Sequence, residues 1–233
     1  MKCLYCGERI VLAIGWGSLL SREEEVLLCD QCTKQLVPIA GECCVRCSRP
    51  FQGWAEEFRK GDFCYDCVRW EEETKWKGIL ECNVSLYEYN DFLKGLVSRY
   101  KFCGDYVISK VFREKFRKAI KRLEFDLLVP VPLSDERLYE RGFNQAESII
   151  VEASFFPTVA LKRIHTEKQS KKSRDERKNL ENVFQLLNEI EVKGRSVVLV
   201  DDIYTTGSTL IYAAKLLKKN GAINVSSVTL ARG

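Results

Sequence analysis

The sequence predicts an α/β protein, with a parallel sheet flanked by helices and a small cysteine-rich module before it. Two observations lead to this prediction. From residue 84 onward, strand-like and helix-like runs alternate, as in consecutive βαβ units. Nine of the eleven cysteines lie within the first 67 residues. The chain therefore changes character near residue 80, and we expect the module at 1–70, a polar linker at 71–83 and the α/β domain at 84–233.

The cysteine-rich module contains four Cys-x-x-Cys pairs. Two such pairs make one tetrahedral thiolate site of the structural-zinc type, so four pairs allow one or two Zn²⁺ ions. A redox role would need a single pair in a strand–helix context, which is not found here. A sequential and a cross-braced pairing fit the spacing equally well. The predicted ligands are Cys3, Cys6, Cys29, Cys32, Cys44, Cys47, Cys64 and Cys67.

The three remaining cysteines are not predicted to bind metal. Cys43 is a spare, because Cys44 keeps the two-residue gap to Cys47. Cys82 and Cys103 are expected as small buried apolar residues.

The elements of the α/β domain follow from periodicity and from turn residues. Helix 91–102 has apolar residues at helical spacing, and strand 195–202 has the continuous apolar run of a central parallel strand. Prolines end strand 125–133, and Asn220-Gly221 ends the last helix. In chain order, the predicted strands are 84–89, 125–133, 157–163, 195–202 and 223–232, and the predicted helices are 91–102, 110–122, 143–156 and 208–222.

Two adjacent acids close the strand at 195–202. Ligands of parallel sheets bind beyond the carboxyl ends of the strands, and Asp201 and Asp202 lie at such an end. A turn rich in hydroxyls then leads into a helix, whose first N–H groups attract anions, and Gly207 lets a ligand approach the backbone. This combination suits a sugar phosphate. The carboxylates would accept from ribose hydroxyls or hold Mg²⁺, and the phosphate would lie on the amides.

The stretch Val197–Thr209 resembles the 5-phosphoribosyl-1-pyrophosphate (PRPP) site of type I phosphoribosyltransferases, with its hydrophobic strand, two acids and Thr-Gly-x-Thr turn. A Walker B acid pair is the alternative, but the chain lacks the Gly-rich lysine loop that accompanies it. The resemblance implies a type I phosphoribosyltransferase-like sheet, with Asp201 and Asp202 as catalytic residues and Mg²⁺ bound together with PRPP. It assigns ligand binding to Asp201, Asp202, Tyr204, Thr205, Thr206, Gly207, Ser208 and Thr209.

Residues 129–147 and 163–184, together with the cysteine-rich front, resemble the ComF/ComFC family of competence-associated proteins linked to DNA uptake. Arg141–Gln145 is the most distinctive part, and Lys172 stands where the family usually has Leu. The resemblance implies a pyrophosphate loop near 130–137 and a mobile flap at 163–178. It also implies a ComFA-type ATP-dependent DNA translocase as partner.

Two classes of function fit this chain. One is a PRPP-binding protein of natural transformation that has no fast turnover, and the other is an active phosphoribosyltransferase with an unidentified acceptor. Purine-salvage enzymes of this fold often carry an acid in the phosphate loop, where this chain has Thr205, and no C-terminal hood for a nucleobase is expected after Gly233. Binding is therefore favoured over catalysis, and enzymatic activity stays an open question.

The charge distribution favours a polyanionic partner, because residues 1–83 carry a net charge of −3 and residues 84–233 one of +7. Single-stranded DNA would suit the basic segment 162–178 and the basic helix 110–122, although such faces are often merely solvated. Tyr100, Phe102 and Phe143 are candidates for base stacking. The predicted DNA contacts are Lys162, Arg163, Lys168, Lys171, Lys172 and Arg174.

Membrane insertion is not predicted, since no run approaches the roughly 20 apolar residues that a spanning helix needs. The first ten residues also lack the basic-then-apolar order of a signal peptide. We therefore expect a cytoplasmic protein, in which disulfides are rare.

Overall fold

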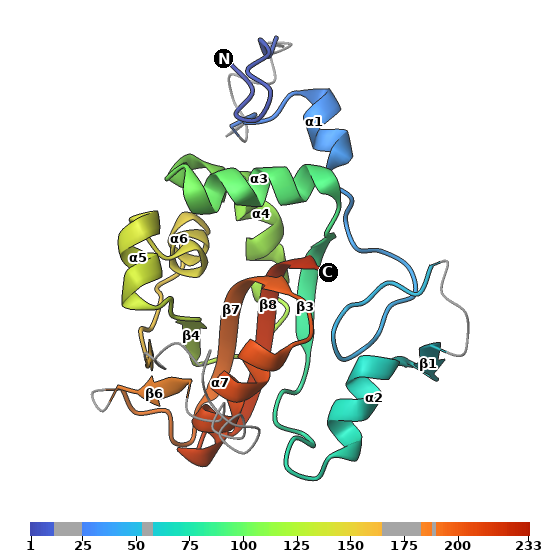
Figure 1. Cartoon of the computed structure of the whole chain (residues 1–233), viewed down its shortest axis with the longest axis vertical. Coiled ribbons are helices and arrows are strands. Elements are labelled where there is room, and N and C mark those ends of the chain that lie inside the picture. Colours follow the sequence, from blue (N-terminus) through green and yellow to red (C-terminus); the bar gives the residue numbers. More distant parts are fainter. Residues whose placement is uncertain (12–24, 53–57, 165–182, 188–189) are drawn as a thin grey trace, which may run out of the picture.

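The computed structural model describes residues 1–11, 25–52, 58–164, 183–187 and 190–233. Its centre is a four-stranded parallel sheet with the order β3-β8-β7-β4 (Figure 1). The strands are β3 (Asn83–Glu88), β4 (Leu127–Pro130), β7 (Ser196–Tyr204) and β8 (Asn224–Arg232). The expected parallel α/β sheet is confirmed.

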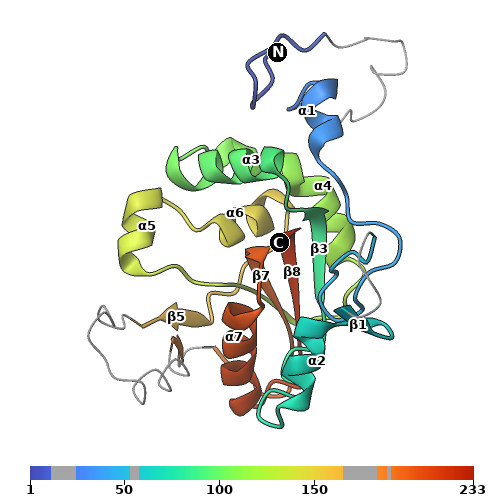
Figure 2. The same ribbon diagram turned by 45° about the vertical axis from the view of Figure 1, so that its right-hand side comes forward.

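Helices cover both faces of this sheet, as Figures 1 and 2 show. One face carries α3 and α4, joined by a short 3₁₀ turn at Tyr106–Ile108, and α6. The other face carries α7 and the C-terminal end of the cysteine-rich module. The helices of the described residues are α1 (Asp30–Gln35), α2 (Tyr65–Glu72), α3 (Asp91–Phe102), α4 (Ser109–Ile120), α5 (Asp135–Arg141), α6 (Gln145–Glu152) and α7 (Ser208–Lys219).

Strand β7 shows why its apolar run is continuous. Successive side chains of a strand point to opposite faces, so both parities are buried when both faces are covered. Val198 and Val200 belong to the core beneath α3, α4 and α6, whereas Val197 and Leu199 belong to the core beneath α7. The two cores therefore meet across this strand.

Side-chain caps fix the starts of the helices nearest to the carboxyl ends of the strands. The Asn90 side chain accepts from the Leu93 amide at the start of α3, Ser134 from the Arg137 amide at α5, and Asn144 from the Ala146 amide at α6. Helix α5 ends at Gly142, which has a positive φ of 76°. The sequence reading did not anticipate α5 because this segment has no buried residues and hence no apolar stripe.

The strand expected at 157–163 forms, as β5 (Leu161–Arg163), but it does not join the parallel sheet. It pairs antiparallel with β6 (Phe184–Leu186), which the sequence reading missed. Within the cysteine-rich module, β1 (Arg59–Lys60) and β2 (Phe63–Cys64) form a third small sheet.

The segment expected as a polar linker contributes to the core. Trp76 and Leu80 are buried among the residues beneath α7, and the Trp76 ring lies edge-on to both Trp70 and Tyr212. Two expected burials were also wrong: Cys103 is exposed and Cys82 is half-buried. Cys103 follows the last turn of α3, where its side chain meets solvent.

Candidate functional site

The eight predicted metal ligands gather into two clusters of four thiols, one of Cys3, Cys6, Cys29 and Cys32, and one of Cys44, Cys47, Cys64 and Cys67. We call them the first and the second cysteine cluster. Within each cluster all sulfur atoms lie within 4.8 Å of one another. Of the two pairings left open by the spacing, the structure has the sequential one. Cys43 takes part in neither cluster, as expected.

The geometry of both clusters fits tetrahedral zinc. Zn–S bonds of about 2.3 Å give sulfur–sulfur edges of about 3.8 Å. The Cys6–Cys29 and Cys47–Cys64 sulfur distances are 3.6 and 3.5 Å. In the second cluster, hydrogen bonds from the three neighbouring thiols lower the pKa of Cys44, whereas the hydrogen bonds of Cys67 with its own three neighbours raise the pKa of Cys67. Four thiols crowded in this way need a cation before all of them can ionise.

The two clusters pack on opposite faces of the sheet. Cys3 and Cys32 belong to the core that includes α3 and α4, and the Tyr5 ring lies 4.5 Å from that of Phe92 on α3. The second cluster belongs to the core beneath α7. The cysteine-rich module is therefore part of both cores of the domain.

The residues at the end of β7 form the candidate ligand site. The turn from Tyr204 to Thr209, which we call loop 204–209, leads directly into α7. The amides of Thr205, Thr206 and Gly207 have no acceptor among the residues that the structure describes. Three unpaired N–H groups at the start of a 12-residue helix are a strong anion-binding arrangement.

The shape of this loop requires a glycine at position 207. Its φ is +82°, a conformation that side chains rarely adopt, and a Cβ atom there would collide with the Tyr204 hydroxyl. The Tyr204 ring itself is buried in the core beneath α7. The Tyr204 side chain thus shapes the loop from below, and its carbonyl accepts from Arg232 and from the Gly233 amide. Its direct contact with a ligand stays a prediction.

The two acids lie beside loop 204–209 near the end of β7. The Asp202 amide donates to Asp201 Oδ1 at 2.9 Å, and Asp202 Oδ2 lies 2.5 Å from the Nζ atom of Lys101 on α3. Burial, followed by repulsion from Asp202, raises the pKa of Asp201 to about 7. The sequence reading missed Lys101, because only the packing of α3 against the sheet brings it to the acids.

A cavity of about 280 Å³ lies above the acids. It is bounded by the chain after β4, by α5 and α6, and by loop 204–209. Its cations come from three elements, α3, α5 and β5, and are Lys101, Arg137, Arg141 and Arg163. Burial, followed by the charge of Arg137, lowers the pKa of Arg163. Because three arginines converge here, the cavity suits a ligand with several negative charges.

The segment predicted as a pyrophosphate loop does border this cavity. Val131, Pro132, Leu133 and Arg137 all line it. The distinctive 141–145 stretch lines it too, and Arg141 Nη1 donates to Gln145 Oε1 at 2.8 Å. The 141–145 stretch therefore forms part of one wall of the cavity, and a hydrogen bond between two of its own side chains holds that wall in place.

The predicted nucleic-acid residues divide into two groups. Arg163 lines the cavity, where its guanidinium lies 5.6 Å from the centre of the Phe184 ring, while Lys162 is exposed on β5. Lys168, Lys171, Lys172 and Arg174, and most of the expected flap, lie outside the described residues. Of the stacking candidates, Tyr100 is wrong: it is fully buried, and its hydroxyl donates to the Gln145 carbonyl. Phe102 is 70% exposed.

The basic helix face at 110–122 is largely engaged within the fold. Lys110 pairs with Glu25, and Arg113 and Arg117 both lie against Glu114. Lys115 lies over the Tyr87 ring at 4.4 Å. The basic residues that remain exposed are Lys118, Lys121 and Arg122.

Comparisons with known proteins agree with this architecture. Residues 140–233 match the phosphoribosyl transferase domain model and residues 1–68 the double zinc ribbon domain model. Competence protein ComFC of Bacillus subtilis is 38% identical over 99% of this chain and 94% of its own. Competence protein ComFC of Streptococcus pneumoniae is 33% identical over the whole of both chains. DNA utilization protein YhgH of Escherichia coli K12 is 37% identical over 46% of this chain and 49% of its own.

None of the described helices is long and apolar enough to cross a membrane. With its two ribbon-type cysteine clusters, its phosphoribosyltransferase-type sheet and full-length similarity to two relatives, the chain belongs to the ComFC family of competence proteins.

Proposed function

We propose that this protein acts in DNA uptake during natural transformation and that it binds PRPP with Mg²⁺ in the cavity above Asp201 and Asp202. The observation that carries the proposal is the juxtaposition of loop 204–209, with its unpaired amides, and a pair of acids. The amides would hold the 5-phosphate, and the carboxylates the ribose hydroxyls or Mg²⁺. The names of the relatives supply the connection to competence and to DNA.

The four cations of the cavity support a pyrophosphate-bearing sugar over a simple ribose phosphate. Arg137 and Arg141 lie on or at the end of α5, across the cavity from loop 204–209, where the pyrophosphate would extend. Bidentate contacts from arginines fit phosphate oxygens, and Mg²⁺ usually binds through phosphates and one or two carboxylates. Asp202, which pairs with Lys101 in this structure, would exchange that contact for the metal or a ribose hydroxyl.

Binding without fast turnover is the expected behaviour. Mg²⁺ supplies charge stabilisation to a departing pyrophosphate when it is bound. Apart from Asp201 and Asp202, which the ribose or Mg²⁺ would occupy, the described residues lining the cavity include no acid or histidine to activate an acceptor, and Thr205 occupies the loop position where an acid would serve. Phosphoribosyl transfer to an unidentified acceptor is the alternative.

The test is a thermal-shift and calorimetric titration with PRPP, ribose 5-phosphate and pyrophosphate, each with and without Mg²⁺. PRPP with Mg²⁺ should raise the melting temperature most, and Asp202→Asn should remove the effect. Asp126→Asn is the matched control, because Asp126 directly precedes β4 and accepts from the Ser196 amide at the amino end of β7, the end opposite to Asp202. No shift with millimolar PRPP would refute the site, and rapid release of pyrophosphate with some acceptor would favour the transferase.

Single-stranded DNA is proposed as a second ligand, with the exposed Lys162 and Phe102 as described contacts. Phe102 lies 5.6 Å from the Arg141 guanidinium and offers a ring on which a base can stack. We expect the affinity to fall steeply with salt and to weaken in Lys162→Glu. Lys193→Glu, near the amino end of β7, is the control. Binding that ignores salt, or equal loss in both variants, would count against a defined DNA surface.

The proposed protein partner is a ComFA-type ATP-dependent translocase in the cytoplasm, docking on the cysteine-rich module. We call the segment that holds the second cysteine cluster the second ribbon. On it, Val45 and Tyr65 are 57% and 58% exposed and give this docking surface apolar anchors. Tyr65→Asp should weaken binding of the purified translocase in an interferometry experiment. Phe156→Asp, on the remote loop after α6, should leave it unchanged. The opposite pattern would place the partner elsewhere.

A further inference from the structure

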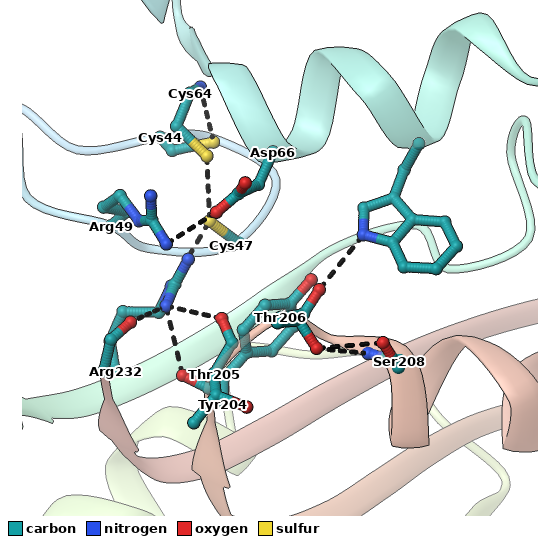
Figure 3. A network of polar contacts seen from close by, with 12 residues as sticks. Cys44, Cys47, Arg49, Cys64, Asp66, Tyr204, Thr205, Thr206, Ser208 and Arg232 are labelled. Atoms are coloured by element: carbon teal, nitrogen blue, oxygen red, sulfur yellow. Dashed lines mark hydrogen bonds and ion pairs between the residues drawn. The ribbon is translucent and has the colours of Figure 1, made fainter. Parts of the chain in front are cut away.

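Two side chains, Arg232 and Trp70, connect the second cysteine cluster to loop 204–209. Figure 3 shows Arg232 between Cys47 and Thr205. We propose that both are positioning residues: they hold the loop in its ligand-binding shape, and they do so only while metal occupies the second cluster. This inference rests on the proposed ribose-phosphate site. It predicts that a structural metal on one domain sets the anion affinity of the other.

Arg232 is the last residue of β8, and only 4% of it is exposed. Among the described residues no Asp or Glu side chain pairs with it, and its Nη1 also donates to the Gly233 main-chain oxygen. A buried guanidinium is costly unless a negative charge compensates for it. The side chains that can supply this charge are the thiols of the second cluster, because Arg232 Nε donates to Cys47 Sγ at 3.4 Å. Four thiolates around Zn²⁺ carry a net negative charge, so the loaded cluster is the counterion of Arg232.

The other end of the guanidinium holds loop 204–209. Arg232 Nη1 donates to the Tyr204 carbonyl at 3.1 Å and to the Thr205 carbonyl at 2.9 Å, and its planar group lies over the Tyr204 ring. A peptide carbonyl and the next N–H point in opposite directions. Arg232 fixes these two carbonyls on the side that faces the second cysteine cluster. The amides of Thr205 and Thr206 therefore point away from this cluster, toward the anion site.

Trp70 makes an independent contact one residue further along. It lies on α2, which begins directly after the ligand Cys64 and contains the ligand Cys67. Its indole Nε1 donates to the Thr206 carbonyl at 3.0 Å. Three consecutive carbonyls at the start of the loop are thus held by side chains whose positions depend on the second cluster. In the described part of the chain, the first cluster makes no contact of this kind with the loop.

The test uses the full chain loaded with zinc, the variants Arg232→Gln and Trp70→Phe, and Arg46→Gln as the matched control. Arg46 also links the second ribbon to the domain, through the Leu80 carbonyl and Glu71, but it touches neither a sulfur nor the loop. We expect Arg232→Gln to raise the PRPP dissociation constant at least about tenfold and Trp70→Phe about fivefold. The control should bind PRPP like the parent chain.

Two further readouts test the connection without relying on PRPP. Arg232→Gln should release zinc from the second cluster to a chelator faster than the parent or Arg46→Gln does. The NMR signal of the Trp70 indole N–H, assigned by its loss in Trp70→Phe, should shift and exchange faster with water in Arg232→Gln. Arg232→Lys should retain zinc through its charge yet bind PRPP weakly, since a single ammonium group cannot reach both Cys47 Sγ and the loop carbonyls.

The outcomes separate this inference from the proposed function. If the parent chain does not bind PRPP, the ribose-phosphate site is wrong, while zinc release and the indole signal still decide whether Arg232 couples cluster and loop. If the parent binds PRPP and all variants bind it equally, the inference is overturned and the site stands. Unchanged zinc release and an unchanged indole signal in Arg232→Gln would overturn it in either case.

Discussion

At the scale of single residues, the conformation of loop 204–209 depends on Gly207. Gly207→Ala should cost at least about 1 kcal/mol of stability from its positive φ and should also abolish PRPP binding, because the new methyl group displaces the Tyr204 ring or the loop. Gly194→Ala is the control: Gly194 has a φ of +73° but open space around it. Denaturation and calorimetry on both variants separate the two effects. PRPP binding by Gly207→Ala would contradict the role of the close contact.

Asp201 should make ligand binding depend on pH. Because its pKa is raised to about 7, a proton occupies the carboxyl in acid and competes with Mg²⁺ or a ribose hydroxyl. Affinity for Mg²⁺ with PRPP should therefore rise between pH 6 and 8 and then level off. The variant Asp201→Asn should bind weakly at every pH. A flat profile in the parent chain would show that Asp201 takes no part.

The same shift has a consequence for stability. An acid whose pKa is higher in the folded than in the unfolded state destabilises the fold as pH rises from about 4 through 7, because the folded chain holds the proton more tightly. Asp201→Asn removes this cost. Its melting temperature without ligand should exceed that of the parent at pH 8 and match it near pH 4. Equal melting temperatures at pH 8 would contradict the burial of this charge.

At the scale of elements, each cysteine cluster is a separate metal-dependent unit. We expect two zinc ions per chain by elemental analysis, and one in each of Cys32→Ser and Cys67→Ser. Since the clusters lie in different cores, Cys32→Ser should loosen the packing of α3, and Cys67→Ser that of α2 and α7. Hydrogen exchange of these helices would follow the difference. A single zinc ion in the parent chain would contradict two filled sites.

At the scale of the whole molecule, the ribbons are structural parts of the sheet domain. Removing residues 1–70 would expose the apolar surface that Leu28 and Leu36 cover on one face and the second cluster covers on the other. The truncated chain 71–233 should therefore melt well below the full chain and aggregate. Calorimetry compares the two, with the full chain plus chelator as a second reference. An equally stable truncated chain would mean that the ribbons are only attached modules.

The sequence determined the local features of this protein, because these depend on residue type and spacing along the chain. Cys-x-x-Cys pairs predict thiolate sites. The apolar run of β7 followed by two acids predicts a ligand site at the edge of a parallel sheet. Helix α3 could be predicted to the residue, since Asn90 caps it and its apolar spacing is regular. The fold class and the two catalytic candidates therefore needed no coordinates.

Only the tertiary structure decided which distant groups meet. The spacing of the cysteines could not choose between sequential and cross-braced clusters, because both satisfy four-coordinate zinc. Lys101 pairs with Asp202, which is 101 positions away in the sequence. Arg232 contacts both Cys47, 185 positions away, and Thr205, 27 positions away. Trp76 reads as part of a charged linker until the α7 face is there to bury it. Contacts between elements depend on how those elements pack, and no periodic pattern in the sequence shows which elements pack together.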